Sequence, residues 1–145
     1  FSIPVLTLTN VTGYKATKCQ EKRIAKAAAK LIYAFHDMTA PKVNVIVGAA
    51  NGTASLAMNN SADMTYAWPQ ATIGMMDPVS AAKIMYAKEI EEDASVLAEK
   101  TAEYAQLQGS VTKAASRGYV DNIVEPVDVR KYVIGALEML YTKRQ

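Results

Sequence analysis

The sequence predicts an α/β fold in which helices and strands form layers. Short β-branched or alternating runs recur between helical segments, in the order β-α-β-α-β-(β)-α-α-β-α. Gly, Pro, Asp and Thr mark the switches between them. In addition, 145 residues that are 50% hydrophobic and 21% charged have the composition of a globular domain with a real core.

The N-terminal third predicts one strand and one long helix. Residues 5–11 alternate apolar and polar side chains, as a half-buried strand does, and Gly13 permits a turn with positive φ. Thr17 and Gln20 have the spacing of a capping box, so a helix should follow and run to about Met38. Its expected apolar face is Ile24, Ala28, Leu31, Phe35 and Met38.

The stretch 43–76 organises the rest of the chain. It begins with the β-branched run 43–47, breaks at a small-residue turn over 48–52 and opens a helix over 53–58. A second strand is expected over 63–66, and residues 73–76 read as a further short strand or turn.

The C-terminal half predicts three helices and one extended segment. Asp77 and Pro78 start the first helix, which fades in the acidic run 89–92. Asp93 should cap the second, which breaks near Gly109 and ends at Gly118. An extended segment follows over 119–124. The expected apolar sides are Leu97, Tyr104, Leu107 and Val111 on the second helix, and Val129, Val133, Ala136, Leu137 and Leu140 on a last helix capped by Asp128.

Composition excludes several classes of function. A net charge of +2 is too small to indicate nucleic acid or an anionic membrane as a partner. No apolar run approaches the roughly 20 residues of a membrane span. The single cysteine, Cys19, makes no internal disulfide, so a reducing compartment such as the cytoplasm fits. The first residue is Phe1 and not Met, so we expect residues 1–145 to be a fragment of a longer subunit.

Side-chain chemistry is scarce. No phosphate-binding loop is present, and one histidine with one cysteine cannot build the usual zinc sites, so no metal is expected. His36 fits a packed or surface residue. Cys19 fits an inert thiol, and the alternative is a reactive thiol beside neighbouring lysines. The carboxylates of residues 89–93 fit a solvated helix junction, and Asp63 fits a structural hydrogen-bond acceptor.

The turn at 51–54 is the best candidate for a site. A strand that leads through a small-residue turn into a helix presents free backbone N–H groups at one point. Such a point can stabilise a carbonyl oxygen that gains negative charge. The alternative is a tight β–α connection whose small residues serve close packing, and composition alone favours that alternative.

Five segments in order resemble one family. They are I-P-V-L-T-L-T-N-V-T-G-Y (3–14), A-K-L-I-Y-A-F with P-K-V-N-V-I (29–46), G-T-A-S-L-A-M (52–58), T-Y-A-W-P-Q-A-T-I-G-M-M (65–76) and R-G-Y-V-D-N-I-V-E-P (117–126). The chain resembles the C-terminal domain of carboxyltransferase subunits from biotin-dependent acyl-CoA carboxylases and decarboxylases. The resemblance implies a crotonase-like, ClpP-like layered ββα superhelix, present here as a single partial domain.

The resemblance also implies an activity and partners. Such subunits transfer carboxyl between carboxybiotin, held on a biotin carboxyl carrier protein, and an acyl-CoA. The acyl-CoA is held by the N-terminal domain of a neighbouring subunit, so a homo-oligomer is implied. A membrane would be involved only through a decarboxylase partner. By position, Thr53 and Ala54 would supply the oxyanion hole, and the biotin-binding residues would be Gly13, Tyr14, Asn51, Gly52 and Ser55.

Departures from the family leave a second hypothesis open. Lys22 and Arg23 stand where the family has a glycine pair, Thr12 replaces a proline, and Leu56 stands where carboxylases often have aspartate. The chain could therefore be a degenerate crotonase-like domain with a structural or oligomerisation role. A single-domain crotonase-type hydratase is weaker, because no paired glutamates flank the turn.

Overall fold

A computed structural model describes residues 2–15, 17–59 and 61–143 of the chain. The strands are β1 (Val5–Val11), β2 (Lys42–Asn51), β3 (Met64–Ala67), β4 (Thr72–Gly74) and β5 (Asn122–Ile123). The helices are α1 (Lys18–Glu21), α2 (Ile24–Asp37), α3 (Gly52–Asn59), α4 (Pro78–Met85), α5 (Ala87–Glu92), α6 (Val96–Gln108), α7 (Val111–Ser116) and α8 (Val129–Met139). The mixture confirms the predicted α/β class.

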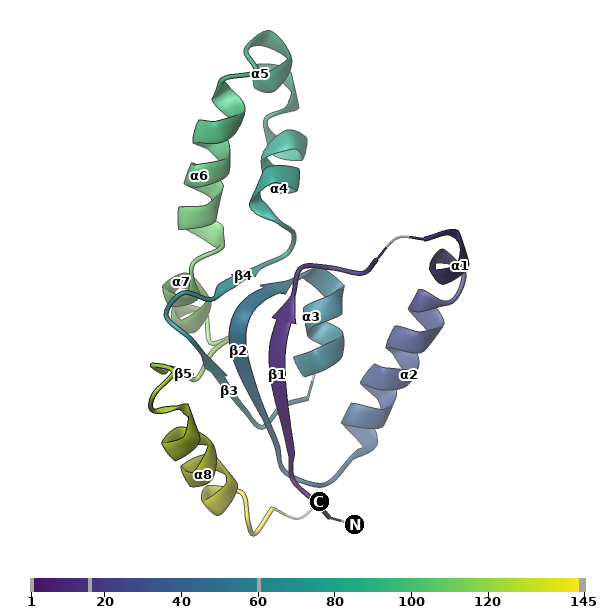
Figure 1. Cartoon of the computed structure of the whole chain (residues 1–145), viewed down its shortest axis with the longest axis vertical. Coiled ribbons are helices and arrows are strands. Elements are labelled where there is room, and N and C mark those ends of the chain that lie inside the picture. Colours follow the sequence, from purple (N-terminus) through teal and green to yellow (C-terminus); the bar gives the residue numbers. More distant parts are fainter. Residues whose placement is uncertain (1, 16, 60, 144–145) are drawn as a thin grey trace.

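The strands form a sheet in which every pairing is parallel. The order is β1-β2-β3-β5, and β4 pairs with the carboxyl end of β2. Because parallel neighbours need crossover connections, helices lie on both faces of the sheet. Figure 1 shows β2 curving through the centre, α8 on one side, and the α4–α6 hairpin extending away from the sheet.

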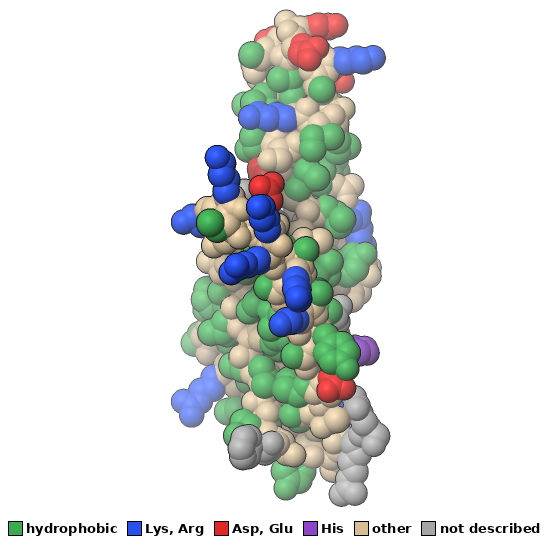
Figure 2. Space-filling view, turned by 90° about the vertical axis from the view of Figure 1, so that its right-hand side faces the viewer, with side chains coloured by type: hydrophobic (Ala, Val, Ile, Leu, Met, Phe, Trp, Pro, Cys, Tyr) green, Lys and Arg blue, Asp and Glu red, His purple; other side chains and the backbone are tan. Residues whose placement is uncertain are grey.

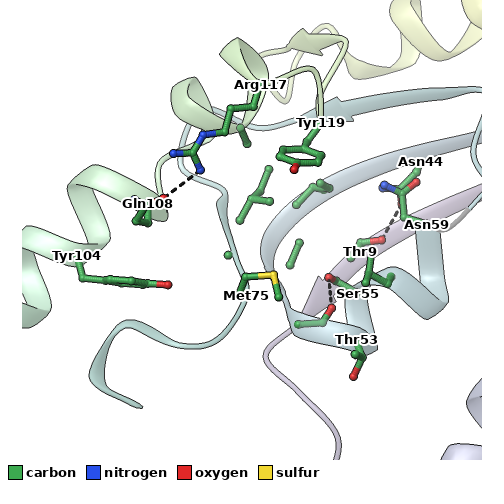
Figure 3. A pocket seen from close by; sticks show the side chains of 17 residues that line it. Thr9, Asn44, Thr53, Ser55, Asn59, Met75, Tyr104, Gln108, Arg117 and Tyr119 are labelled. Carbon is green, nitrogen blue, oxygen red and sulfur yellow. Dashed lines mark hydrogen bonds between the residues drawn. The ribbon is translucent and has the colours of Figure 1, made fainter. Parts of the chain in front are cut away.

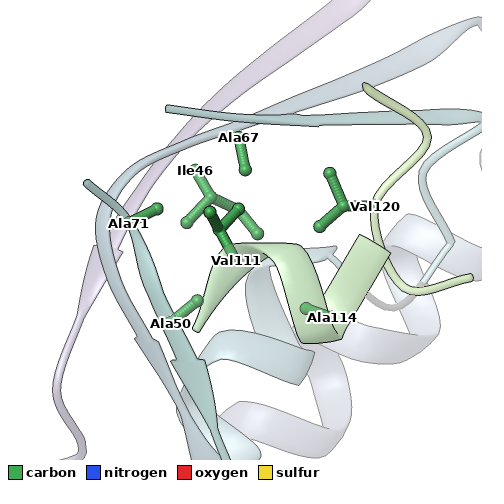
Figure 4. Packing of buried hydrophobic residues seen from close by; sticks show 7 residues of the cluster. All are labelled: Ile46, Ala50, Ala67, Ala71, Val111, Ala114 and Val120. Carbon is green, nitrogen blue, oxygen red and sulfur yellow. The ribbon is translucent and has the colours of Figure 1, made fainter. Parts of the chain in front are cut away.

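Two apolar clusters hold the layers together. The cluster under α8 contains Val43, Val45, Tyr66, Val124, Val133 and Ala136. The cluster under α7 contains Ile46, Ala50, Ala67, Ala71, Val111, Ala114 and Val120, and Figure 4 shows these side chains meeting between β2 and α7. Since side chains alternate along a strand, β2 contributes to both clusters.

The small-residue turn expected over 48–52 is wrong, because β2 continues to Asn51. Between the pairs Thr9–Ile46 and Val11–Ala50, β2 advances four residues and β1 two, so β2 carries two extra residues as a bulge. The side chain of Asn10 closes this bulge, and its Oδ1 accepts from Ala49 N at 3.0 Å. A Cβ on Gly48 would lie 2.5 Å from that same oxygen, so a larger residue there would displace the Asn10 side chain.

The single long helix expected to Met38 is also wrong. It is divided into α1 and α2 at Lys22 and Arg23, although Thr17 caps α1 by accepting from Gln20 N at 3.4 Å, as predicted. On α2 the half-buried positions include Ile32, whereas Leu31 is exposed. The apolar stripe is therefore shifted by one residue at its middle.

In the C-terminal half, most element types are as predicted and several details differ. Asp77 caps α4 through Val79 N and Ser80 N, as expected. Asp93 does not cap α6. Its carboxylate accepts from the backbone N–H of Ser95, and Ser95 itself is the N-cap residue that precedes the helix. Leu107 is exposed. Within the extended segment 119–124, residues 122–123 form β5, and Asp121 N and Val124 N on either side donate to Thr65 O and Ala67 O. Asp128 is the N-cap residue of α8 but makes no side-chain capping bond.

Lys42 ties the start of β2 to the end of α2. It is 5% exposed, and its Nζ donates to Phe35 O and Met38 O, both at 2.8 Å. Its backbone N–H donates to Asp63 Oδ2 at 2.8 Å, and Lys143 Nζ lies 2.7 Å from Asp63 Oδ1. Asp63 therefore has a structural role, as the sequence indicated.

Of the helices that the structure describes, none combines the length and apolar character needed to cross a bilayer.

We predict that Lys42→Met lowers the free energy of unfolding by about 2 kcal/mol, because two carbonyls at the end of α2 lose a charged donor. The midpoint of urea unfolding measures this. Lys26→Met, on the exposed side of α2, is the control and should change stability by less than about 0.5 kcal/mol. Equal midpoints for the two variants would contradict a stabilising role for the hydrogen bonds from Lys42 to the end of α2.

Candidate functional site

The site is built where β2 passes into α3. Gly52 begins α3 with φ 61°, a left-handed conformation that other residues rarely adopt. A Cβ at this position would lie 2.9 Å from Met75 O. The chain can therefore turn from strand to helix here only with glycine, directly beside the end of β4.

Three further interactions fix the turn. Ala49, Ala50 and Asn51 of β2 pair with β4. Ser55 Oγ donates to Gly52 O at 2.8 Å, and the Tyr14 hydroxyl donates to Thr53 O at 3.2 Å. The first turn of α3 is therefore held from the sheet, from within the helix and from the segment after β1.

A cavity of about 470 Å³ opens beside this turn. It lies between α3 and α7 over the sheet and reaches the end of α6, as Figure 3 shows. Its walls are largely apolar, from Ile46, Ala50, Leu56, Ile73 and Ala114. A concave, mostly apolar cavity with a few polar groups is the usual form of a small-molecule site.

The polar groups of the cavity are mainly neutral. None of the described residues that line it is a carboxylate, a histidine or a cysteine. Its one guanidinium, that of Arg117, donates to Gln108 Oε1 at 3.0 Å. The first N–H groups of α3 have no acceptor within the helix, and the positive end of the helix dipole lies there. This arrangement can stabilise negative charge on an oxygen but offers no obvious general base.

The structure brings some of the predicted site residues together. Gly52, Thr53 and Ser55 line the cavity. Ala54, in the same turn, is buried with 4% of its surface exposed and is not among the lining residues. Tyr14 and Asn51 are not among the lining residues. Tyr14 reaches the turn through its hydroxyl, and Asn51 is buried where β2 meets β4.

Gly13 follows β1 and does not line the cavity either. Its φ is 156°, so the positive φ expected there is present, and a Cβ would meet nothing within 4 Å. The site therefore depends on Gly52 sterically but not on Gly13.

Other lining residues were not predicted. Met75, Tyr104, Gln108, Arg117 and Tyr119 come from three segments far from the turn in sequence. No local pattern marks them, because their proximity depends on how the α4–α6 hairpin and α7 return to the sheet. Asn44, by contrast, had a signal: it is a polar residue inside the β-branched run 43–47.

The resolved pKa shifts belong to groups outside the cavity lining. Hydrogen bonds from the side chain and backbone of Ser80 hold the pKa of Asp77 below its usual value. Burial, together with the nearby charge of Asp121, raises the pKa of Tyr66. Within the described ranges, no three His, Cys, Asp or Glu side chains are grouped as a metal site would need. Apart from the Arg117 guanidinium, the described lining residues carry no ionised side chain, so the dipole of α3 is the other source of fixed charge at the site.

Basic side chains gather on α1 and α2, away from the cavity. Figure 2 shows this group on the face formed by these helices; its exposed members are Lys18, Lys22, Arg23, Lys26 and Lys30. Cys19 is exposed within the same segment. His36 lies exposed near the end of α2.

Comparison with known proteins gives one consistent family. The sequence model of the family described as "Carboxyl transferase domain" matches residues 1–145. The chain is 40% identical to methylmalonyl-CoA decarboxylase subunit alpha of Veillonella parvula, over all of this chain and 28% of that protein. It is 39% identical to the methylmalonyl-CoA carboxyltransferase 12S subunit of Propionibacterium freudenreichii subsp. shermanii, over all of this chain and 29% of that subunit. The chain thus spans less than a third of these relatives.

Solved structures agree with the sequence relatives. A transcarboxylase 12S crystal structure, described as a hexamer with methylmalonyl-CoA and methylmalonic acid bound, matches the whole chain with a TM-score of 0.95 and 38% identity, over 29% of its own length. The beta subunit of geranyl-CoA carboxylase from P. aeruginosa matches 99% of the chain with a TM-score of 0.81 and 23% identity, which shows the same fold. These neighbours confirm a crotonase-like, partial α/β domain.

We predict that Gly52→Ala destabilises the protein more than Gly118→Ala. Both glycines have left-handed φ, of 61° and 81°, but only a Cβ at Gly52 meets another atom closely. Gly118→Ala should cost about 1–2 kcal/mol for the conformation alone. Gly52→Ala should cost about 2–4 kcal/mol, because the close contact with Met75 O is added. Thermal unfolding of both variants measures the difference, and equal losses would contradict the proposed packing of the turn.

Proposed function

This chain belongs to the carboxyl transferase domain family, and on that premise we propose that it forms the biotin-side half of an acyl-CoA carboxyltransferase active site. The whole protein would transfer a carboxyl group between biotin and the α-carbon of an acyl thioester. The observation that carries the proposal is the Gly52 turn, which presents the N-terminus of α3 to an apolar cavity.

The cavity suits a biotin ring. Biotin is a compact, largely apolar bicycle with one polar ureido edge, and the cavity has apolar walls and backbone donors at one end. When bound, biotin supplies the nitrogen that carries the carboxyl group. Gly52 and Ser55 would line its site, while Gly13, Tyr14 and Asn51 would support the turn from outside the lining.

Thr53 and Ala54 perform the chemistry through their backbone. Their N–H groups, at the positive end of α3, would hold the ureido oxygen of a bound biotin and would stabilise negative charge on it. The Tyr14 hydroxyl holds the Thr53 peptide from its carbonyl side. Positioning and preorganised dipoles then account for catalysis without an acid or base side chain from the described cavity lining.

The other components of the reaction would come from partners. We place the acyl-CoA on the N-terminal domain of a neighbouring subunit and the biotin on a carrier protein, in a cytoplasmic assembly. Exposed apolar side chains support an oligomer: Leu8 on β1 is 60% exposed and Ile84 on α4 is 68% exposed. The 12S relative is described as a hexamer within a multienzyme core.

A structural role is the second candidate function. The observation in its favour is the interruption between α1 and α2 at Lys22 and Arg23, two residues that depart from the glycine pair of the family pattern. Saturable binding of biotin, measured by calorimetry on the full-length protein and lost in Gly52→Ala, would exclude a purely structural domain. Absence of binding in the unmodified protein would favour it.

We predict that Thr53→Pro in the full-length protein lowers the rate of carboxyl transfer to or from free biotin by roughly 10²–10³, because one N–H donor is removed. Proline is tolerated in the first turn of a helix, so folding should be retained. Thr53→Ala keeps the N–H and is the matched control, with nearly normal transfer expected. A folded Thr53→Pro protein that transfers carboxyl normally would rule out the oxyanion role.

A further inference from the structure

Asn44 is a polar residue at the floor of the cavity. It lies in the middle of the sheet, is 0% exposed, and lines the cavity together with Thr9 and Asn59. Figure 3 shows Asn44 and Asn59 on the side of the cavity opposite Tyr104 and Gln108. The polar floor is therefore separate from the wall that α6 provides.

The Asn44 amide is held firmly at one of its two ends. Its Oδ1 accepts from Thr7 Oγ1 at 2.8 Å and from Thr9 Oγ1 at 2.7 Å. These two bonds fix the plane of the amide and direct Nδ2 away from β1. Yet Nδ2 is buried and has no hydrogen-bond partner among the described residues. A buried donor without a partner is costly, so such groups in native proteins usually have a role or an unseen partner.

The cavity has the shape of a groove that runs from the Gly52 turn to Asn44. Its floor includes Asn44, Ile46 and Ala50 of β2, and one wall runs along α3 from Gly52 to Asn59. Asn44 and Ala50 are six residue steps apart along β2, which is at most about 20 Å of extended chain. A bicyclic ring at the turn would leave the far part of this groove for an extended group.

We propose that Asn44 is a specificity-determining residue, whose Nδ2 donates a hydrogen bond to the amide carbonyl of an extended, mainly apolar arm in this groove. The apolar walls pack against the methylene groups of the arm, and Asn44 pairs with its polar group. Asn59, whose Oδ1 accepts from Thr65 Oγ1 at 3.3 Å, lines the same end.

Two arms have this chemistry in the proposed reaction. The biotinyl-lysine arm and the pantetheine arm of coenzyme A each carry amide carbonyls between methylene segments. The identity of the ligand therefore rests on the proposed function. The observation that Asn44 Nδ2 has no partner among the described residues is independent of that function. Three compounds distinguish the two sources. Biotinyl-lysine carries the amide carbonyl of the biotin arm, and biotinol, whose arm ends in a hydroxyl without an amide carbonyl, is its matched control. Pantetheine represents the arm of coenzyme A.

The test is calorimetric titration of the full-length protein with these three compounds. We expect Asn44→Leu to weaken binding of biotinyl-lysine about tenfold, since one hydrogen bond to a buried donor is lost. Binding of biotinol should stay within about twofold, because the ring contacts at the turn are unchanged. Asn44→Asp keeps an acceptor for both threonine hydroxyls but replaces the Nδ2 donor by a carboxylate oxygen that faces the amide carbonyl of the arm. It should therefore weaken the binding of biotinyl-lysine as well. Asn122→Leu, on exposed β5, is the control and should change none of the affinities.

Each outcome decides one point. A loss confined to pantetheine supports the donor role of Asn44 and assigns the arm to coenzyme A. Unchanged binding of both biotinyl-lysine and pantetheine in folded Asn44→Leu and Asn44→Asp proteins overturns the inference and leaves the proposed function standing. Failure of the unmodified protein to bind any of the three compounds overturns both.

Discussion

The structure depends on one constraint: β2 is a central strand, and its backbone groups have to be paired along ten residues. Different strands pair with different parts of β2. β1 pairs with its first half and again at Ala50, β3 pairs with its first half, and β4 pairs with its last three residues. The bulge at Gly48 allows the strand to bend toward β4, and Asn10 pairs with the amide that the bulge frees. The position of the Gly52 turn follows from this path, because β4 fixes where β2 stops.

Local patterns predicted most elements of the fold because they depend on neighbouring residues. The cap at Asp77 and the glycine after α7 each have their cause within a few positions. The alternation in β1 correctly marked a strand, but Thr9 is the buried residue and Leu6 and Leu8 are exposed. The turn expected over 48–52 failed for the opposite reason. Its small residues look like a loop, but β4 lies about twenty residues further along the chain and extends the strand through them. Pairing with a distant partner overrides local composition.

The candidate site was predictable only in part, for a similar reason. The strand–Gly–helix junction is local, so the sequence marked the turn at 51–54, and the family resemblance then pointed to Thr53 and Ala54 within it. The remaining walls come from β4, α6 and α7, and their residues meet only in the folded chain. Asn44 lies between these cases. A polar residue in an apolar strand signals a special role, but only the structure shows that one end of its amide is paired and the other is not.

The site combines features that suit a shared active centre. The backbone donors that we propose as catalytic groups are fixed by packing, and the cavity is mostly apolar, so the ligands would bring most of the reacting atoms. Large exposed side chains elsewhere, such as Leu8 and Ile84, indicate surfaces that further protein would cover. Under the proposed function, this domain would orient a substrate and stabilise charge, while partners would supply the rest of the reaction.

The most direct measurement is a crystal structure of the full-length protein with biotin bound. The account predicts that the ureido oxygen lies about 2.7–3.1 Å from the backbone nitrogens of Thr53 and Ala54, with the ring in the cavity beside Gly52. A biotin ring bound elsewhere, or turned so that its ureido oxygen faces away from the start of α3, would contradict the central claim.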